Sequence, residues 1–303
     1  MEEQPNKKFK LKDIPTLFKE TFLRWMDSDP WRLSAIIAYY AILSMPALLV
    51  IIINVIGAVW GAEIVKGELT HQFTNVLGVE VAESIETMIS ETQNSDRNLM
   101  STIIGIGTLL FGATGVFYQL QLSLNEIWNI ESNPSSNIKR VIISRARGFA
   151  FILVVGFLLL ISFIISAGIS IFNGYIKSMF PEIVLYTAYV LDVCISLSII
   201  TSLFALMFKY LPDAKISWKS VWAGGFVTAL LFVIGQTLLS LYFTKADPGS
   251  TYGAAGTVIL ILLWVSYSCL ILFFGAQFTW VYAKYYTADI KPTDYAVLKS
   301  DKS

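Results

Sequence analysis

One carboxylic acid lies deep inside an apolar stretch of the chain. Asp192 stands in VLYTAYVLDVCISLS, and Tyr189 and Ser196 share its face of a helix because residues three or four apart are neighbours. An ionised carboxylate is costly in hydrocarbon, so we expect Asp192 to face other helices, where it is protonated, solvated by water or bonded to a donor. The sequence leaves open whether Asp192 lines a path or only holds helices in register.

A second polar pattern runs along the stretch STIIGIGTLLFGATGVFYQLQLSLNE. Alternating steps of four and three residues put eight positions on one stripe of a helix, and all but one are small or polar: Ser101, Gly105, Thr108, Gly112, Gly115, Gln119, Leu122 and Glu126. The stripe is expected to look inward, since lipid would dissolve the other faces. One interpretation is close helix packing on Gly105, Gly112 and Gly115. The other is a path or pocket lined by Thr108, Gln119 and Glu126. Both can hold.

Further polar and bending positions lie in the other apolar stretches. Gln236 and Gln277 are weaker candidates for a lining, because amides inside helix bundles usually bond across helices. Pro46 removes one backbone hydrogen bond and predicts a kink in its helix. Gly253 and Gly256 predict a second place to bend.

Several kinds of chemistry are missing from the sequence. The single histidine, His71, lies in a polar segment, so a Ser-His-Asp or Cys-His site inside the apolar stretches is excluded. No metal-binding or nucleotide-binding motif is present. A formal net charge of zero gives no reason to expect a nucleic acid as partner. We therefore predict a protein with no catalytic residues, no metal and no cofactor, which is not an enzyme.

The composition predicts the elements that hold these residues. The chain of 303 residues is 55% hydrophobic and only 15% charged, well below the quarter that is usual in soluble proteins. The apolar residues come in blocks long enough to cross a bilayer. We predict an all-α membrane protein, a six-helix transmembrane bundle over 34–283, with spans at 34–60, 99–124, 149–172, 185–208, 221–243 and 253–283.

The segments around the spans are polar. Residues 1–33 form the first, in which apolar residues at helical spacing predict an amphipathic helix over Asp13–Met26 on the membrane surface. The acidic segment 61–98 is expected to form short amphipathic helices that cap the bundle. The polar tail covers residues 284–303.

The basic residues give the orientation. With six spans, 18 of the 22 lysines and arginines fall on the side of the two termini and four on the other. Because lysine and arginine stay in the cytoplasm, we predict both termini inside and the 61–98 segment outside.

Several stretches resemble the YihY/BrkB family of bacterial inner-membrane proteins. They are AYYAILSMPALLVII, NEIWNI, SRARGF, YLPDAKISWKSVWAGG and YGAAGTVILILLWVSYSCLILFFGAQFTWVYA. Where the family typically shows GAE, this chain has GAQ with Gln277. The resemblance implies six helices in the bacterial cytoplasmic (inner) membrane, with both ends of the chain on the cytoplasmic side. It also implies a role in transport or export of a small solute or lipid.

Two functions remain open from the sequence. One is a transporter or exporter of an unknown small solute or lipid, in which the polar residues form the lining and Pro46 and Gly253 allow bending. The other is an envelope organiser that transports nothing and binds a partner through segment 61–98. The lipid bilayer is an expected partner in both cases, and a homo-oligomer or an envelope partner is an open alternative.

Overall fold

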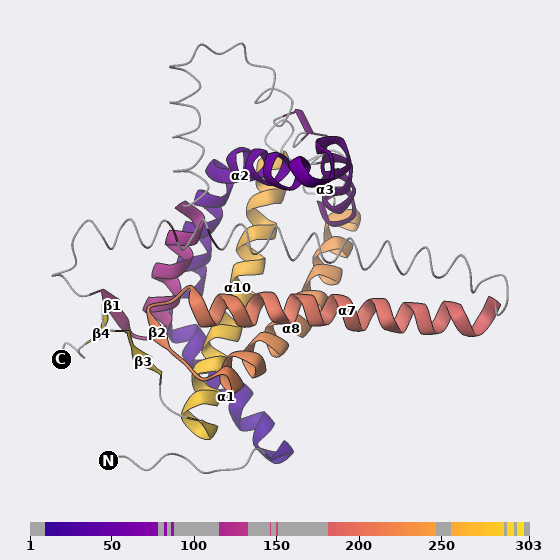
Figure 1. Ribbon diagram of the computed structural model, residues 1–303. Helices are drawn as coiled ribbons and strands as arrows, with labels where there is room; N and C mark the ends of the chain where they lie inside the picture. The colour runs from indigo at the N-terminus through magenta and orange to yellow at the C-terminus, as the bar shows by residue number, and fades with distance from the viewer. Residues whose placement is uncertain are drawn as a thin grey trace, which may run out of the picture.

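The computed structural model describes residues 10–77, 82–83, 86–87, 115–132, 146, 150, 181–246, 256–287, 290–293 and 296–299 (Figure 1). Most of these residues are helical. The helices are α1 (Ile14–Asp27, after a 3₁₀ turn at Leu11–Asp13), α2 (Pro30–Trp60), α3 (Ala62–Leu77), α7 (Pro181–Tyr210), α8 (Trp218–Ala246) and α10 (Gly256–Tyr286). Residues 115–127 are also helical and are called helix 115–127 here.

Long apolar helices dominate this part of the chain, as the composition predicts. Three of them contain stretches that are long and apolar enough to cross a membrane, at Val193–Tyr210, Trp218–Phe243 and Val258–Tyr286. The predicted helical membrane protein is thereby confirmed in its coarse form, while the count of six spans and the orientation stay predictions. The predicted span 149–172 lies outside the described residues, apart from residue 150.

α10 is the centre of the fold. It packs against α8, α2, α1 and α3, and α8 in turn packs against α7. Figure 1 shows α8 and α10 side by side, with the N-terminal part of α7 extending away from the other labelled helices. α10 buries a continuous apolar stripe that includes Leu272, Phe273 and Ala276, so the last predicted span forms the core of the bundle.

α1 forms where the amphipathic pattern predicts a helix, but it does not stand apart from the spans. Leu17 is buried against Phe278 and Val281 of α10, and Trp25 Nε1 donates a hydrogen bond to the Leu270 carbonyl oxygen at 3.2 Å. The contacts of α1 thus lie in the C-terminal half of α10, from Leu270 to Tyr286. The expected position of this helix on the membrane surface stays a prediction.

The segment after α2 begins with a helix of 16 residues, α3, which starts directly after Gly61. Gly61 has a φ of +96°, a conformation that glycine adopts without steric cost, and this lets the chain turn between two helices. α3 packs against α2 through the buried Val65. The amphipathic stretch expected around 81–89 lies almost wholly outside the described residues.

The C-terminal tail joins two loops that are distant in sequence. Strand β1 (Ile130–Ser132) pairs antiparallel with β4 (Ala296–Leu298), and β2 (Ala214–Lys215) pairs antiparallel with β3 (Lys291–Pro292). The tail therefore holds together the loop after helix 115–127 and the loop after α7. Its polar composition did not predict this pairing, because strands of two or three residues are too short for a periodic pattern.

Candidate functional site

A buried polar pair lies where helix 115–127 and α7 end. The Asn125 amide donates from Nδ2 to Asp213 Oδ2 at 3.1 Å, and its Oδ1 accepts the Asp213 backbone N–H at 2.8 Å. Asn125 is 3% exposed and Asp213 is 6% exposed. Asparagine suits this position because it is both donor and acceptor, and it satisfies two groups of one residue at once. We call these two residues the Asn125–Asp213 lock.

The tail adds to the lock through its backbone. Thr293 donates its N–H to the Asp213 carbonyl oxygen at 3.0 Å, and Lys299 donates its N–H to the Asn129 carbonyl oxygen at 2.7 Å. The indole of Trp128, which is 1% exposed, donates from Nε1 to the Ala276 carbonyl oxygen on α10 at 3.0 Å. The end of helix 115–127 and the loop after it are thus fixed to the loop after α7, to α10 and to the tail.

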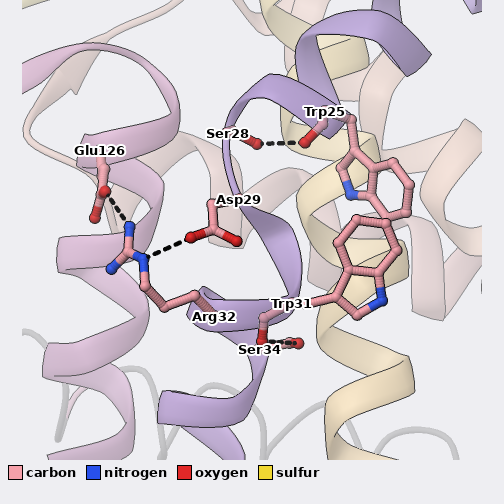
Figure 2. A network of polar contacts seen from close by, with 7 residues as sticks. All are labelled: Trp25, Ser28, Asp29, Trp31, Arg32, Ser34 and Glu126. Atoms are coloured by element: carbon pink, nitrogen blue, oxygen red, sulfur yellow. Dashed lines mark hydrogen bonds and ion pairs between the residues drawn. The ribbon is translucent and has the colours of Figure 1, made fainter.

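A charged cluster joins the start of α2 to the end of helix 115–127. Arg32 Nη2 donates to Glu126 Oε1 at 2.6 Å, and Arg32 Nε donates to Asp29 Oδ2 at 3.0 Å. Figure 2 shows Arg32 between the two carboxylates. Asp29 has a φ of +50°, which aspartate tolerates better than most residues, and it forms the turn between α1 and α2. We call Asp29, Arg32 and Glu126 the charged cluster.

Aromatic side chains flank the charged cluster. The rings of Trp25 and Trp31 lie with centroids 5.3 Å apart (Figure 2), and Trp25 also contacts Phe274 of α10. Ser28 and Ser34 donate their hydroxyls to the carbonyl oxygens of Trp25 and Trp31, which stiffens the turn between α1 and α2. Indoles with one polar edge and one apolar face are typical of the membrane–water boundary.

Gln277 has a defined partner on α1. It is 4% exposed, and its Nε2 donates to the Arg24 carbonyl oxygen at 3.5 Å, a long hydrogen bond. A carbonyl oxygen needs a donor, which an amide supplies and an ionised carboxylate does not. This explains locally why the chain carries GAQ. A mechanism that requires a carboxylate at position 277 does not fit this chain.

Glu20 on α1 connects to the end of α10. Its carboxylate accepts hydrogen bonds from Tyr285 Oη at 2.8 Å and Arg24 Nε at 3.2 Å, and Lys284 Nζ lies 3.8 Å away. Burial alone would raise the pKa of Glu20, but the hydrogen bonds from Tyr285 and Arg24 and the charge of Lys284 outweigh it and lower the pKa below 4.5.

This shift predicts how stability depends on pH. A carboxyl group whose pKa is lower in the folded state stabilises it above the unfolded value, and this contribution is lost as pH falls through the folded pKa. We expect the melting temperature of the detergent-solubilised protein to fall below about pH 4.5, and Glu20→Gln to make that fall shallower. Glu63→Gln, at an exposed position of α3, is the control. Equal acid profiles of Glu20→Gln and the unchanged protein would contradict the assignment.

α8 and α10 approach closely through two glycine–threonine contacts. A Cβ added at Gly224 would lie 1.7 Å from Thr279 Oγ1, and one added at Gly275 would lie 1.7 Å from Thr228 Oγ1. Each threonine hydroxyl bonds to the carbonyl oxygen four residues earlier in its own helix, Thr228 to Gly224 and Thr279 to Gly275. No hydroxyl is left unsatisfied at this contact, so the two helices can pack at backbone distance.

The inward stripe predicted along Ser101–Glu126 is described only from Gly115 onward. Gly115 is buried, and a Cβ there would be in ordinary contact with Tyr40 of α2, at 3.5 Å. Gln119 is half-buried. Leu122 is 36% exposed and the Glu126 side chain is 44% exposed. The end of the stripe thus lies on an exposed face, because the helix turns Leu124, Asn125 and Trp128 toward the core instead.

The other predicted site residues are placed as follows. Thr108, Gly105, Gly112 and Gly253 lie outside the described residues, as do the side chains of Asp192, Tyr189 and Pro46. Ser196 and Gln236 are half-buried on α7 and α8, and Gly256 is the buried first residue of α10. The structure brings Gln119 and Glu126 together on one helix, and it does not test them as a lining with Asp192. Within the described part of the chain, no three side chains of histidine, cysteine, aspartate or glutamate gather as metal ligands would.

Sequence reasoning missed Arg32, Asn125, Asp213, Gly224 and Gly275. Arg32 counted only toward the orientation, and Asp213 only as part of a polar loop. A usable signal existed for the glycines, since Gly224 and Thr228, and Gly275 and Thr279, are each spaced as small-xxx-small pairs.

Comparisons with known proteins agree with a membrane protein. A family model described as Virulence factor BrkB matches residues 21–297. A UPF0761 membrane protein of Psychromonas ingrahamii is 26% identical over 248 residues, which cover 80% of this chain and 79% of the relative. A UPF0761 membrane protein of Pseudomonas aeruginosa is 30% identical over 200 residues, 64% of this chain and 45% of the relative, so the match spans less than half of that protein. No solved structure matches the chain.

Proposed function

This chain belongs to the family of virulence factor BrkB, and we propose from that premise that it moves a small solute or lipid across the cytoplasmic membrane. The resemblance read from the sequence is confirmed, and with it the membrane as the place of action. In this proposal both termini and the basic ends of the spans face the cytoplasm. The path runs between α2 and helix 115–127, past Gln119.

The observation that carries the proposal is the charged cluster. The ion pair of Arg32 and Glu126 joins the start of α2 to the end of helix 115–127, and its side chains are about half exposed. A partly exposed ion pair contributes only about 0–1 kcal/mol, so it can hold two helix ends together and still open. Alternating access needs a closure of this kind at each end of the path. The buried Asn125–Asp213 lock beside it serves as the fixed part.

Access to Gln119 from each side of the membrane tests this function without knowledge of the substrate. Both cysteines are free, so Cys194→Ser and Cys269→Ser give a background for a single Gln119→Cys. We expect a charged, membrane-impermeant thiol reagent to reach this cysteine from the cytoplasmic side. Adding Arg32→Ala should raise the rate about fivefold, the equivalent of about 1 kcal/mol.

The control is the charge-swapped pair Arg32→Glu with Glu126→Arg, which keeps the ion pair and should return the rate toward the starting value. If the cysteine reacted with a lipid-soluble maleimide but not with the charged reagent, in vesicles of either orientation, a water-accessible path would be contradicted. That result would favour the organiser that binds a partner through segment 61–98. Once a solute is known, Asp192→Asn and Gln119→Leu should abolish its transport while membrane insertion is unchanged.

A further inference from the structure

The length of α10 places the charged cluster at a defined depth. Its candidate span, Val258–Tyr286, has 29 residues, whereas about 20 residues cross a hydrocarbon core of about 30 Å. Counted from Val258, the hydrocarbon ends near Gln277, and Trp280 and Lys284 then lie in the headgroup layer. Arg24 stacks on Trp280 at 4.0 Å from the ring centroid, as expected for a cation in that layer.

One indole ties the cluster to this boundary, because Trp128 Nε1 bonds to the Ala276 carbonyl oxygen, beside Gln277. The Leu270 carbonyl oxygen that accepts the Trp25 Nε1 hydrogen bond lies seven residues, about 10 Å, further into the hydrocarbon. Glu126 precedes Trp128 by two residues and pairs with Arg32. The Arg32–Glu126 pair therefore lies close to the level where headgroups meet acyl chains.

The cluster retains capacity to bind at that level. The Arg32 side chain is 48% exposed, and those of Asp29 and Glu126 are 60% and 44% exposed. Arg32 uses Nε and Nη2 for the two acids, and its Nη1 has no hydrogen bond to the described residues. One carboxylate oxygen of Asp29 and one of Glu126 are likewise without a donor there. The cluster thus offers both N–H donors and acceptors, with one more negative charge than positive.

An exposed apolar stripe continues from the cluster toward the middle of the membrane. Tyr39 and Leu43 are each 60% exposed, and they follow Arg32 on one face of α2 at steps of seven and four residues. Leu122 is exposed one turn beyond Glu126 on helix 115–127. From Arg32 to Leu43 the helix rises about 16 Å, roughly half of the hydrocarbon core. This is the reach of one leaflet.

We infer that the charged cluster binds a phospholipid with a zwitterionic headgroup that carries a primary amine. The ammonium bonds to Glu126 and Asp29, the phosphate bonds to Arg32, and an acyl chain lies along Tyr39 and Leu43. Such a headgroup replaces both halves of the Arg32–Glu126 pair, so the pair can open without leaving a charge unpaired in the boundary layer. Whether this phospholipid is also the transported molecule rests on the proposed function. The binding of the phospholipid to the charged cluster does not depend on it.

The test compares three lipids on the full-length protein. The probes are phosphatidylethanolamine, phosphatidylcholine and phosphatidylglycerol with identical, spin-labelled acyl chains, in reconstituted vesicles. We expect phosphatidylethanolamine to associate about fivefold more strongly than either other lipid. Phosphatidylcholine lacks the N–H donors for the carboxylates, and phosphatidylglycerol lacks the positive charge. Glu126→Gln and Arg32→Gln should each abolish the preference.

Glu131→Gln is the matched control, because Glu131 is a similarly exposed acid that pairs with Lys299 at 3.8 Å beyond the end of the helix. It should keep the preference. Equal association of the three lipids, or stronger association of phosphatidylglycerol, would overturn the inference. If the lipids show no preference for phosphatidylethanolamine but Gln119→Cys still reacts with the impermeant reagent from the cytoplasmic side, the proposed path stands and carries another molecule. If the protein prefers phosphatidylethanolamine but Gln119→Cys does not react, the headgroup site is supported and the path is contradicted.

Discussion

Gly224→Ala is expected to lower the stability of the folded protein by roughly 2–3 kcal/mol, at the upper end of what overpacking costs. The new Cβ would lie 1.7 Å from Thr279 Oγ1, 2.8 Å from Thr279 Cβ and 3.2 Å from the Gly275 carbonyl oxygen. A rotation of Thr279 relieves only the first of these contacts, and it also gives up the hydroxyl's hydrogen bond to Gly275. α8 and α10 must then move apart. Thermal unfolding in detergent measures the effect.

Two controls separate this contact from a general effect of adding a methyl group. Gly67 lies in α3 with no atom within 4 Å of an added Cβ, so Gly67→Ala should be neutral or slightly stabilising. Thr279→Gly combined with Gly224→Ala removes the colliding side chain and should recover part of the loss, despite the cost of glycine in a helix. An unchanged melting temperature for Gly224→Ala would show that the two helices do not meet at these residues.

The sequence predicted where the helices lie in the chain better than it predicted which helices pack together. The apolar blocks predicted spans at 185–208 and 221–243, and the structure has α7 at Pro181–Tyr210 and α8 at Trp218–Ala246. Hydrophobicity is a property of each segment alone, so a span can be predicted without knowing which helix packs against it. Which face meets which helix depends on local contacts. Glu126 therefore pairs with Arg32 on an exposed face, although the spacing of the stripe alone predicted an inward position.

The tail and the charged cluster could not be predicted for a different reason. Residues 291–298 pair with segments about 80 and 160 positions earlier in the chain, through strands of two or three residues. Backbone pairing between such short strands requires no particular side-chain types, so the sequence does not predict it. Asp29 stands in the turn before α2 and Arg32 in the first helical turn of α2, and the direction of this helix depends on the left-handed backbone of Asp29. In both places, tertiary contacts select the structure among many that the local sequence allows.

Asn125→Ala is expected to cost roughly 2–3 kcal/mol of stability and to release the C-terminal tail. The substitution removes two buried hydrogen bonds to Asp213 at once, one of them to its carboxylate, and buried groups that lose a partner carry the full cost of desolvation. The Asp213 carbonyl oxygen also accepts the Thr293 N–H, so movement of Asp213 loosens β3. Faster amide hydrogen exchange over residues 290–299 measures the release, and thermal unfolding measures the loss.

Two further variants show whether hydrogen bonding or volume causes the effect. Asn125→Asp keeps the shape of the side chain but replaces its donor by a carboxylate oxygen facing Asp213 Oδ2, so it should be at least as damaging as alanine. Ser123 lies two residues before Asn125 in the same helix, and its buried hydroxyl has no hydrogen-bond partner. Ser123→Ala should therefore be neutral or slightly stabilising. If Ser123→Ala loosened the tail as much as Asn125→Ala, packing rather than the lock would hold the two loops together. The tail would then be a passive cover over the two loops, and the Asn125–Asp213 hydrogen bonds would only follow its packing.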